Sequence, residues 1–194
     1  MTRKPFFGAI LALFLAVPAV AQTAQPFSIQ GSLLVTTLGG DAFEGIEIDP
    51  GAGIELQARW NPSAFSIGAG FQATAHAGTF DFEGTEFDVD FQLTGFFVEP
   101  RYVIFVGSER AAPYVSARLM KLVLNMSFPE FPEAGEEEFD ALGWSAGGGV
   151  LVVLTPRLNL DLGLTAGSMT FDFGDDVKES GTSIVARLGL AFGI

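Results

Sequence analysis

The sequence predicts an all-β protein, an eight-stranded antiparallel up-and-down transmembrane β-barrel. Apolar residues alternate with small or polar ones along most of the chain, eight segments show this alternation, and short connections alternate with longer ones. The last segment is the clearest. One of its faces carries Thr182, Ile184, Ala186, Leu188, Leu190, Phe192 and Ile194, and small or polar residues between them dominate the other. Because side chains alternate across a strand, each such segment predicts one apolar face.

The first 21 residues predict a cleavable signal peptide. Arg3 and Lys4 form a basic start, residues 6–17 form an apolar core, and Ala19 and Ala21 are the small residues of a cleavage site. The apolar run is shorter than the ~20 residues of a membrane-spanning helix. The chain therefore divides into a signal peptide at 1–21 and a barrel domain at 22–194, and we expect export from the cytoplasm.

Composition excludes several classes of protein. There is no cysteine, so neither a disulfide nor a cysteine-based metal site is possible. Without Arg3 and Lys4, 8 basic and 23 acidic residues remain, and their formal charge of −15 argues against nucleic acid as a partner. No later segment is long and apolar enough for a transmembrane helix. A place in the membrane therefore requires a closed barrel, in which every backbone hydrogen bond is satisfied.

The eight expected strands are separated by proline, glycine, asparagine and acidic clusters. Their approximate spans are 27–38, 51–60, 64–80, 86–106, 113–127, 139–154, 157–173 and 181–194. The short connections are 61–63, 107–112 and 155–156, and the longer or more acidic ones are 39–50, 81–85, 129–138 and 174–180. No helix is expected after the signal peptide. The strict alternation predicts tight turns and both chain ends on the periplasmic side, with larger loops outside.

Charged residues in the strands lie opposite the apolar faces. They are Glu55, Arg59, Glu99, Arg101, Arg118, Lys121, Asp161 and Arg187. A soluble barrel would carry such charges on its outer face. A membrane barrel turns its apolar face to lipid and pairs the charges inside. The pattern favours a transmembrane barrel whose narrow interior is filled by side chains. A soluble periplasmic ligand-binding barrel is the less favoured alternative.

Two strands change phase. In the fourth, Phe87 to Phe97 are apolar on odd positions, whereas Tyr102, Ile104 and Val106 are apolar on even ones. We expect a bulge near residues 98–100 to restore the faces, and a similar slip near Met120 in the fifth strand. Aromatic residues near the strand ends predict two interfacial girdles. One comprises Trp60, Phe65, Tyr102 and Phe105, and the other comprises Phe80, Phe87, Phe128 and Phe171.

Nineteen of the 23 acidic residues lie in or beside the four longer connections. This distribution predicts acidic extracellular loops. Hard oxygen ligands in these loops raise the hypothesis of a divalent-cation site, with Glu136, Glu137 and Glu138, or Asp172 with Asp175 and Asp176, as ligands. No EF-hand spacing is present, and a solvated charged rim is the favoured interpretation.

Three segments carry a family resemblance. The glycine-rich run 143–150 with the turn and strand 154–161, and the strand opening at 113–118, resemble small bacterial outer-membrane β-barrel proteins, the opacity-porin and OmpA-barrel-like group. The resemblance implies an eight-stranded barrel in the outer membrane and no particular activity. One feature departs from the family. Its chains usually end in an aromatic residue that the assembly machinery recognises, whereas here Phe192 lies two residues before the end.

Residues with catalytic potential are few. His76 is the only histidine, and Thr74, Asp88 or Ser127 are its conceivable partners in a lipid A-modifying enzyme. The favoured interpretation is an interior histidine with a structural role. Residues 147–149 are interpreted as strand glycines that allow close packing, because no helix start follows them. We assign no catalytic, cofactor-binding or metal-ligating residue.

The sequence thus predicts an integral outer-membrane protein of a Gram-negative bacterium. We expect a structural, surface-exposed monomer that is not an enzyme. Its expected partners are outer-membrane lipids and lipopolysaccharide, and the outer-membrane assembly machinery during biogenesis. The main alternative is a narrow, porin-like pore or conduit for small hydrophobic molecules.

Overall fold

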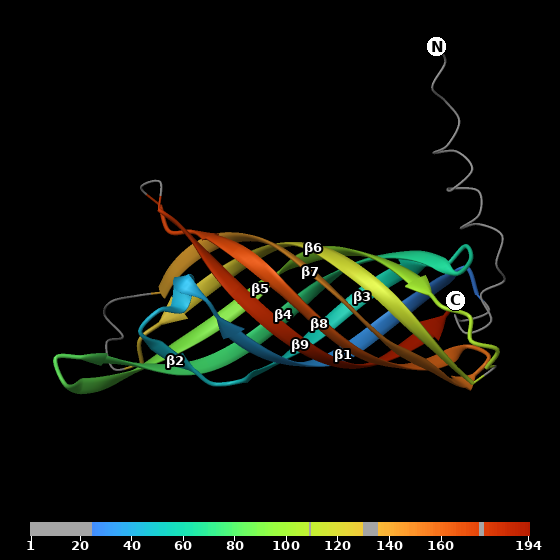
Figure 1. The fold of residues 1–194 in the computed structure, drawn as a ribbon, viewed down its shortest axis with the longest axis horizontal. Coiled ribbons are helices and arrows are strands. Elements are labelled where there is room, and N and C mark those ends of the chain that lie inside the picture. The colour runs from blue at the N-terminus through green and yellow to red at the C-terminus, as the bar shows by residue number, and fades with distance from the viewer. Residues whose placement is uncertain (1–24, 109, 130–135, 175–176) are drawn as a thin grey trace, which may run out of the picture.

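A ring of long antiparallel strands forms the molecule (Figure 1). The computed structural model describes residues 25–108, 110–129, 136–174 and 177–194. The predicted signal peptide lies outside these residues and stays a prediction. The strands are β1 (Phe27–Gly39), β2 (Ile46–Ile48), β3 (Gly51–Trp60), β4 (Phe65–Phe82), β5 (Thr85–Val103), β6 (Ala111–Ser127), β7 (Glu136–Thr155), β8 (Leu158–Asp172) and β9 (Lys178–Gly193).

Eight of these strands close the barrel, as the sequence predicts. Neighbouring strands pair antiparallel in the order β1-β3-β4-β5-β6-β7-β8-β9, and β1 pairs with β9 to complete the ring. The start of β1 and the C-terminus lie at one end, called here the turn end (Figure 1). The opposite end, from which the β4–β5 hairpin projects, is called the loop end. The all-β, up-and-down barrel prediction is confirmed.

The connection expected at 39–50 contains two elements that the sequence does not predict. A single 3-10 turn, η1 (Asp41–Phe43), buries Phe43 in the barrel mouth, which corrects the expectation of no helix. The short strand β2 pairs with β4 beyond the end of β3. Pro50 separates β2 from β3 because proline has no N–H to donate. The Asp49 N–H still donates to the Ala77 carbonyl at 2.9 Å, so β2 continues along β4 in line with β3.

The connection expected at 81–85 is a tight turn rather than a longer loop. Glu83 and Gly84 turn the chain with φ angles of 55° and 80°, and the Gly84 N–H donates to the Asp81 carboxylate at 2.9 Å. Positive φ at both central residues suits the twist of a two-residue hairpin. Strands β4 and β5 therefore run on beyond their neighbours and form the projecting hairpin (Figure 1).

The bulge expected near residues 98–100 and the slip expected near Met120 are both absent. β5 keeps one register with β4 and with β6 on both sides of Pro100, and β6 keeps one register with its neighbours through Met120. The same parity faces inward throughout, so Leu93 and Phe97 point inward like Glu99. What changes along β5 is the kind of residue on each face, and the direction in which the side chains point stays the same. Towards the loop end the interior is apolar and the outer face is polar, as in a barrel wall that meets water.

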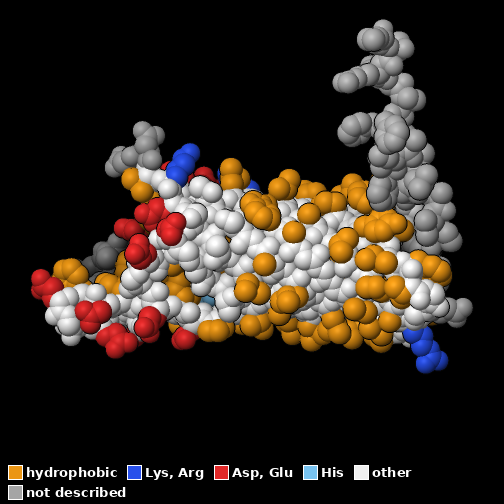
Figure 2. All heavy atoms as spheres, viewed as in Figure 1, with side chains coloured by type: hydrophobic (Ala, Val, Ile, Leu, Met, Phe, Trp, Pro, Cys, Tyr) orange, Lys and Arg blue, Asp and Glu red, His pale blue; other side chains and the backbone are white. Residues whose placement is uncertain are grey.

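The outer face between the two ends is apolar. Its exposed side chains include Ile29, Leu33, Ile54, Leu56, Phe96, Leu119, Leu164 and Leu188. Figure 2 shows hydrophobic side chains spread over this wall and acidic side chains gathered at the loop end. Among the described residues, no helix has the length and hydropathy to cross a membrane. This wall is the surface that contacts lipid.

Only one of the two predicted aromatic girdles faces outward. At the turn end, Trp60 and Phe105 are exposed. At the loop end, Phe171 is fully buried, and Phe80 and Phe128 pack against the apolar interior. The Phe87 ring stacks on that of Phe80, with centroids 5.5 Å apart. The prediction of a second girdle from these residues is wrong, because the strands extend past the apolar wall and their aromatic residues fill the barrel mouth.

Leu33→Arg and Gln92→Arg test the position of the lipid-facing wall. Leu33 is 62% exposed within it, whereas Gln92 lies on the outer face of β5 nearer the loop end. In lipid vesicles, we expect Leu33→Arg to lower the free energy of unfolding by about 2–4 kcal/mol and Gln92→Arg by about 0–1 kcal/mol. Urea titration monitored by tryptophan fluorescence measures both. Equal losses would contradict the assignment.

Candidate functional site

Seven charged side chains are buried in the barrel interior among the described residues. They are Glu55 and Arg59 from β3, Glu99 and Arg101 from β5, Arg118 from β6, Asp161 from β8 and Arg187 from β9. Each belongs to the inward parity of its strand, as the sequence predicts. The sequence also predicts Lys121 among them, but its side chain is 67% exposed on the outer wall, 3.4 Å from Asp140. This placement follows from the constant register of β6.

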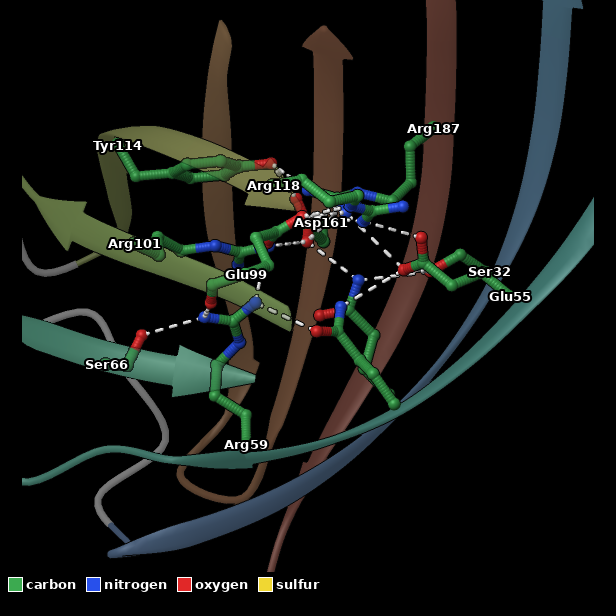
Figure 3. Close-up of polar contacts among 12 residues, drawn as sticks. Ser32, Glu55, Arg59, Ser66, Glu99, Arg101, Tyr114, Arg118, Asp161 and Arg187 are labelled. Carbon is green, nitrogen blue, oxygen red and sulfur yellow. Dashed lines mark hydrogen bonds and ion pairs between the residues drawn. The ribbon is translucent and has the colours of Figure 1, made fainter. Parts of the chain in front are cut away.

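Glu99 lies at the centre of this charged lumen and is 0% exposed. Four guanidinium groups contact its carboxylate (Figure 3). The nitrogen–oxygen distances are 2.6 Å to Arg59, 3.0 Å to Arg101, 2.6 Å to Arg118 and 3.0 Å to Arg187. These residues come from four different strands, so one carboxylate joins opposite parts of the wall. Charge-assisted hydrogen bonds of this kind are short and strong.

Two further carboxylates complete the charged lumen. Asp161 accepts hydrogen bonds from Arg101 at 2.9 Å, from the Gln30 amide at 2.8 Å and from the Tyr114 hydroxyl at 2.6 Å. Glu55 contacts Arg118 at 2.7 Å and Arg187 at 3.4 Å. Buried charges are tolerated when they are paired and hydrogen-bonded, and the carboxylates here meet that condition.

Glycines on β7 and β8 make room for Tyr114. Gly149 and Gly163 are cross-strand neighbours. A Cβ added to Gly149 would lie 2.5 Å from the Tyr114 hydroxyl oxygen, and one added to Gly163 would lie 2.7 Å from it. The sequence predicts packing glycines at 147–149 but does not identify Tyr114 as their neighbour. The sequence gives no local sign of this contact, because the tyrosine lies on β6, far along the chain from the glycines on β7 and β8.

Apolar clusters close the lumen on both sides of the charges. The loop-end cluster comprises Phe43, Val89, Phe91, Leu93, Phe97, Met120, Leu122, Leu124, Ala141, Met169 and Phe171. The turn-end cluster comprises Val103, Ala112, Tyr114 and Leu151. Within the first, the Phe43 ring from η1 packs edge-on against Phe91 and Phe171, with centroids 5.9 and 5.4 Å apart. The turn η1 thus places one side chain over the mouth of the barrel.

Little free volume remains inside. Two partly open cavities of the lumen have about 20 Å³ each: one is lined by Arg59 and Arg101 among others, and the other by Gln72 and Arg118 among others. Each volume has room for about one water molecule. The interior is therefore filled by side chains, as expected for a narrow eight-stranded barrel.

His76 and Ser127 both line one pocket of about 450 Å³, but no described hydrogen bond joins the conceivable catalytic side chains to one another. His76 points inward and is 4% exposed, and its Nδ1 lies 3.4 Å from the Asp49 carbonyl oxygen. Asp88 and Ser127 belong to the outward parity of β5 and β6, so their side chains lie on the opposite face of the wall from the imidazole. Thr74 faces inward, but no described hydrogen bond joins it to His76. A nucleophile and a base need hydrogen-bond reach of each other, which these residues lack.

Asp172 is one of the residues predicted as divalent-cation ligands. The carboxylate of Asp172 lies 3.7 Å from the Lys178 ammonium group. Asp175, Asp176 and the side chain of Glu136 lie outside the described residues. Among the residues that are described, no three or more His, Cys, Asp or Glu side chains are grouped as metal ligands. The hypothesis stays a prediction.

Comparison with known proteins gives a family and a fold. The family described as outer membrane protein beta-barrel domain matches residues 7–192. Neisserial surface protein A has a similar structure with a TM-score of 0.65 and 15% sequence identity, covering 87% of this chain and 97% of that one. OprG from Pseudomonas aeruginosa has a TM-score of 0.58 and 11% identity, covering 89% and 97%. No curated protein sequence matches significantly. At these identities the two structures establish a shared fold.

Glu99→Gln tests the central carboxylate. The substitution keeps the shape of the side chain but leaves four arginines without their shared charge, so we expect a loss of about 3–5 kcal/mol in the free energy of unfolding. The exposed Glu86 provides a control, because Glu86→Gln should change stability by no more than about 0.5 kcal/mol. Urea titration in detergent micelles measures both. An unchanged midpoint for Glu99→Gln would contradict the central role of this group.

Gly163→Ala and Tyr114→Phe test the packing of the tyrosine. Alone, Gly163→Ala should destabilise the protein by about 1–3 kcal/mol because its methyl group meets the Tyr114 hydroxyl. In the Tyr114→Phe background that oxygen is absent, so the penalty should shrink. A double-mutant cycle of unfolding free energies measures the coupling. Strictly additive penalties would show that the two residues do not interact.

Proposed function

Because the chain belongs to the outer membrane protein β-barrel domain family, we propose that it acts as a sealed structural barrel that presents acidic segments at the cell surface. Membership places it in the bacterial outer membrane, among membrane lipids. We propose further that it is a monomer without enzymatic activity. The filled interior carries this proposal, since the two described cavities beside the charged lumen have about 20 Å³ each and apolar clusters lie on both sides of the charges.

The distribution of charge supports an orientation. Acidic side chains gather at the loop end, where the hairpin of β4 and β5 projects (Figure 2). We propose that this end faces the medium and that the turn end, with the C-terminus, faces the periplasm, as in other up-and-down outer-membrane barrels. Lipopolysaccharide would then surround the outer part of the wall. Phe192, exposed near the end of β9, is the proposed contact for the assembly machinery.

A conduit for small hydrophobic molecules is the second candidate. The observation that favours it is the apolar interior beneath the barrel mouth, where Phe91, Leu122 and Phe171 are fully buried. Passage through the barrel would, however, require a molecule to cross the charges around Glu99. Breaking a buried network of this kind is costly, so the sealed scaffold is the better supported function.

Electrical recording separates the two candidates. In planar bilayers, we expect the purified protein to give no stepwise conductance, because the lumen is closed by side chains. Liposome swelling with small sugars should likewise give no signal, whereas a general porin in the same preparation gives a clear one. Reproducible single-channel openings that depend on the amount of inserted protein would contradict the sealed scaffold.

A further inference from the structure

The buried charges of the lumen do not balance. Four arginines face three carboxylates among the described buried residues, so these groups carry a formal charge of +1. The carboxylates are Glu55, Glu99 and Asp161, and all three already pair with arginine. An uncompensated charge among buried side chains is costly, and a counter-ion offsets that cost.

One cavity lies beside two of the four arginines. Arg59 and Arg101 line it together with uncharged residues, including Gln30, Ser66 and Asn159. No carboxylate is among its described lining residues. All five of these side chains are at least nine-tenths buried, and the two arginines supply charged nitrogen donors. The cavity is therefore an electropositive site with polar walls.

Both arginines retain an unused donor. The terminal nitrogens of Arg59 contact Glu99 and Ser66, and a terminal nitrogen of Arg101 contacts Glu99 and Asp161. The Nε atom of each is buried and has no hydrogen-bond partner among the described residues. Buried donors without partners usually mark a site for an unseen water or ion.

We propose that this cavity binds one monatomic halide ion, chloride under ordinary conditions. Its volume of about 20 Å³ suits a single particle close to the size of water. A water molecule would fill the space but would leave the formal charge uncompensated. A halide both occupies the volume and restores neutrality around Arg59 and Arg101.

Bromide replaces chloride and scatters anomalously, so it locates the ion directly. The full chain is refolded and crystallised in sodium bromide, and an anomalous difference map is calculated at the bromine absorption edge. We expect a peak within hydrogen-bonding distance of both arginines. A map without a peak in this cavity, or with bromide only on the outer surface, would overturn the proposal.

Stability in solution gives an independent test. A ligand that binds only the folded state raises stability with its concentration. We expect a higher urea midpoint in sodium chloride than in sodium gluconate at equal ionic strength. Identical midpoints in the two salts would overturn the proposal.

Asn159→Asp supplies the missing negative charge within the cavity. Asn159 is 3% exposed, and the substitution changes its shape little. We expect the chloride dependence and the bromide peak both to disappear. Arg157→Gln is the matched control, because it removes a charge from the exposed turn between β7 and β8 and should leave the dependence intact. Chloride dependence that persists in Asn159→Asp would contradict the site, and the bromide map of the unmodified protein decides the question if this variant does not fold.

Discussion

One buried carboxylate, that of Glu99, constrains the whole interior. Its contacts with arginines from β3, β5, β6 and β9 tie together strands that are far apart in the ring. Because those charges are stable only when paired, the strand registers that bring them together are the ones the fold must adopt. The same contacts fill the lumen, and this filling is the basis of the proposed scaffold function.

The same strands form two parts of the barrel wall, which differ in whether the apolar side chains face outward or inward. Around the charged lumen the outer face is apolar and the inner face is polar. Towards the loop end this polarity reverses, with Leu93 and Leu122 inside and Gln92 and Lys121 outside. Lipid surrounds the part of the wall around the charged lumen, and water surrounds the part towards the loop end. Each face therefore matches its surroundings without any bulge. The Phe43 side chain from η1 completes the apolar interior at the mouth.

Local alternation is enough to predict the strands and most of the inward charges. Residues such as Glu55, Arg59 and Asp161 lie opposite apolar runs, so parity alone places them inside. The polarity pattern misleads where the environment changes from lipid to water. There the inward residues are the apolar ones, so the pattern puts Lys121 and the loop-end phenylalanines on the wrong side. The position of Tyr114 beside two glycines depends on pairings between distant segments, which a local pattern does not contain.

Contact between lipid and side-chain methyl groups tests the reversal of polarity most directly. In lipid nanodiscs with methyl-labelled leucine, nuclear Overhauser effects from the acyl chains should reach Leu33, Leu56, Leu164 and Leu188, which are exposed on the wall. They should not reach Leu93, Leu122 or Leu124, which are buried in the loop-end cluster. Acyl-chain contacts to the second group and none to the first would contradict the account.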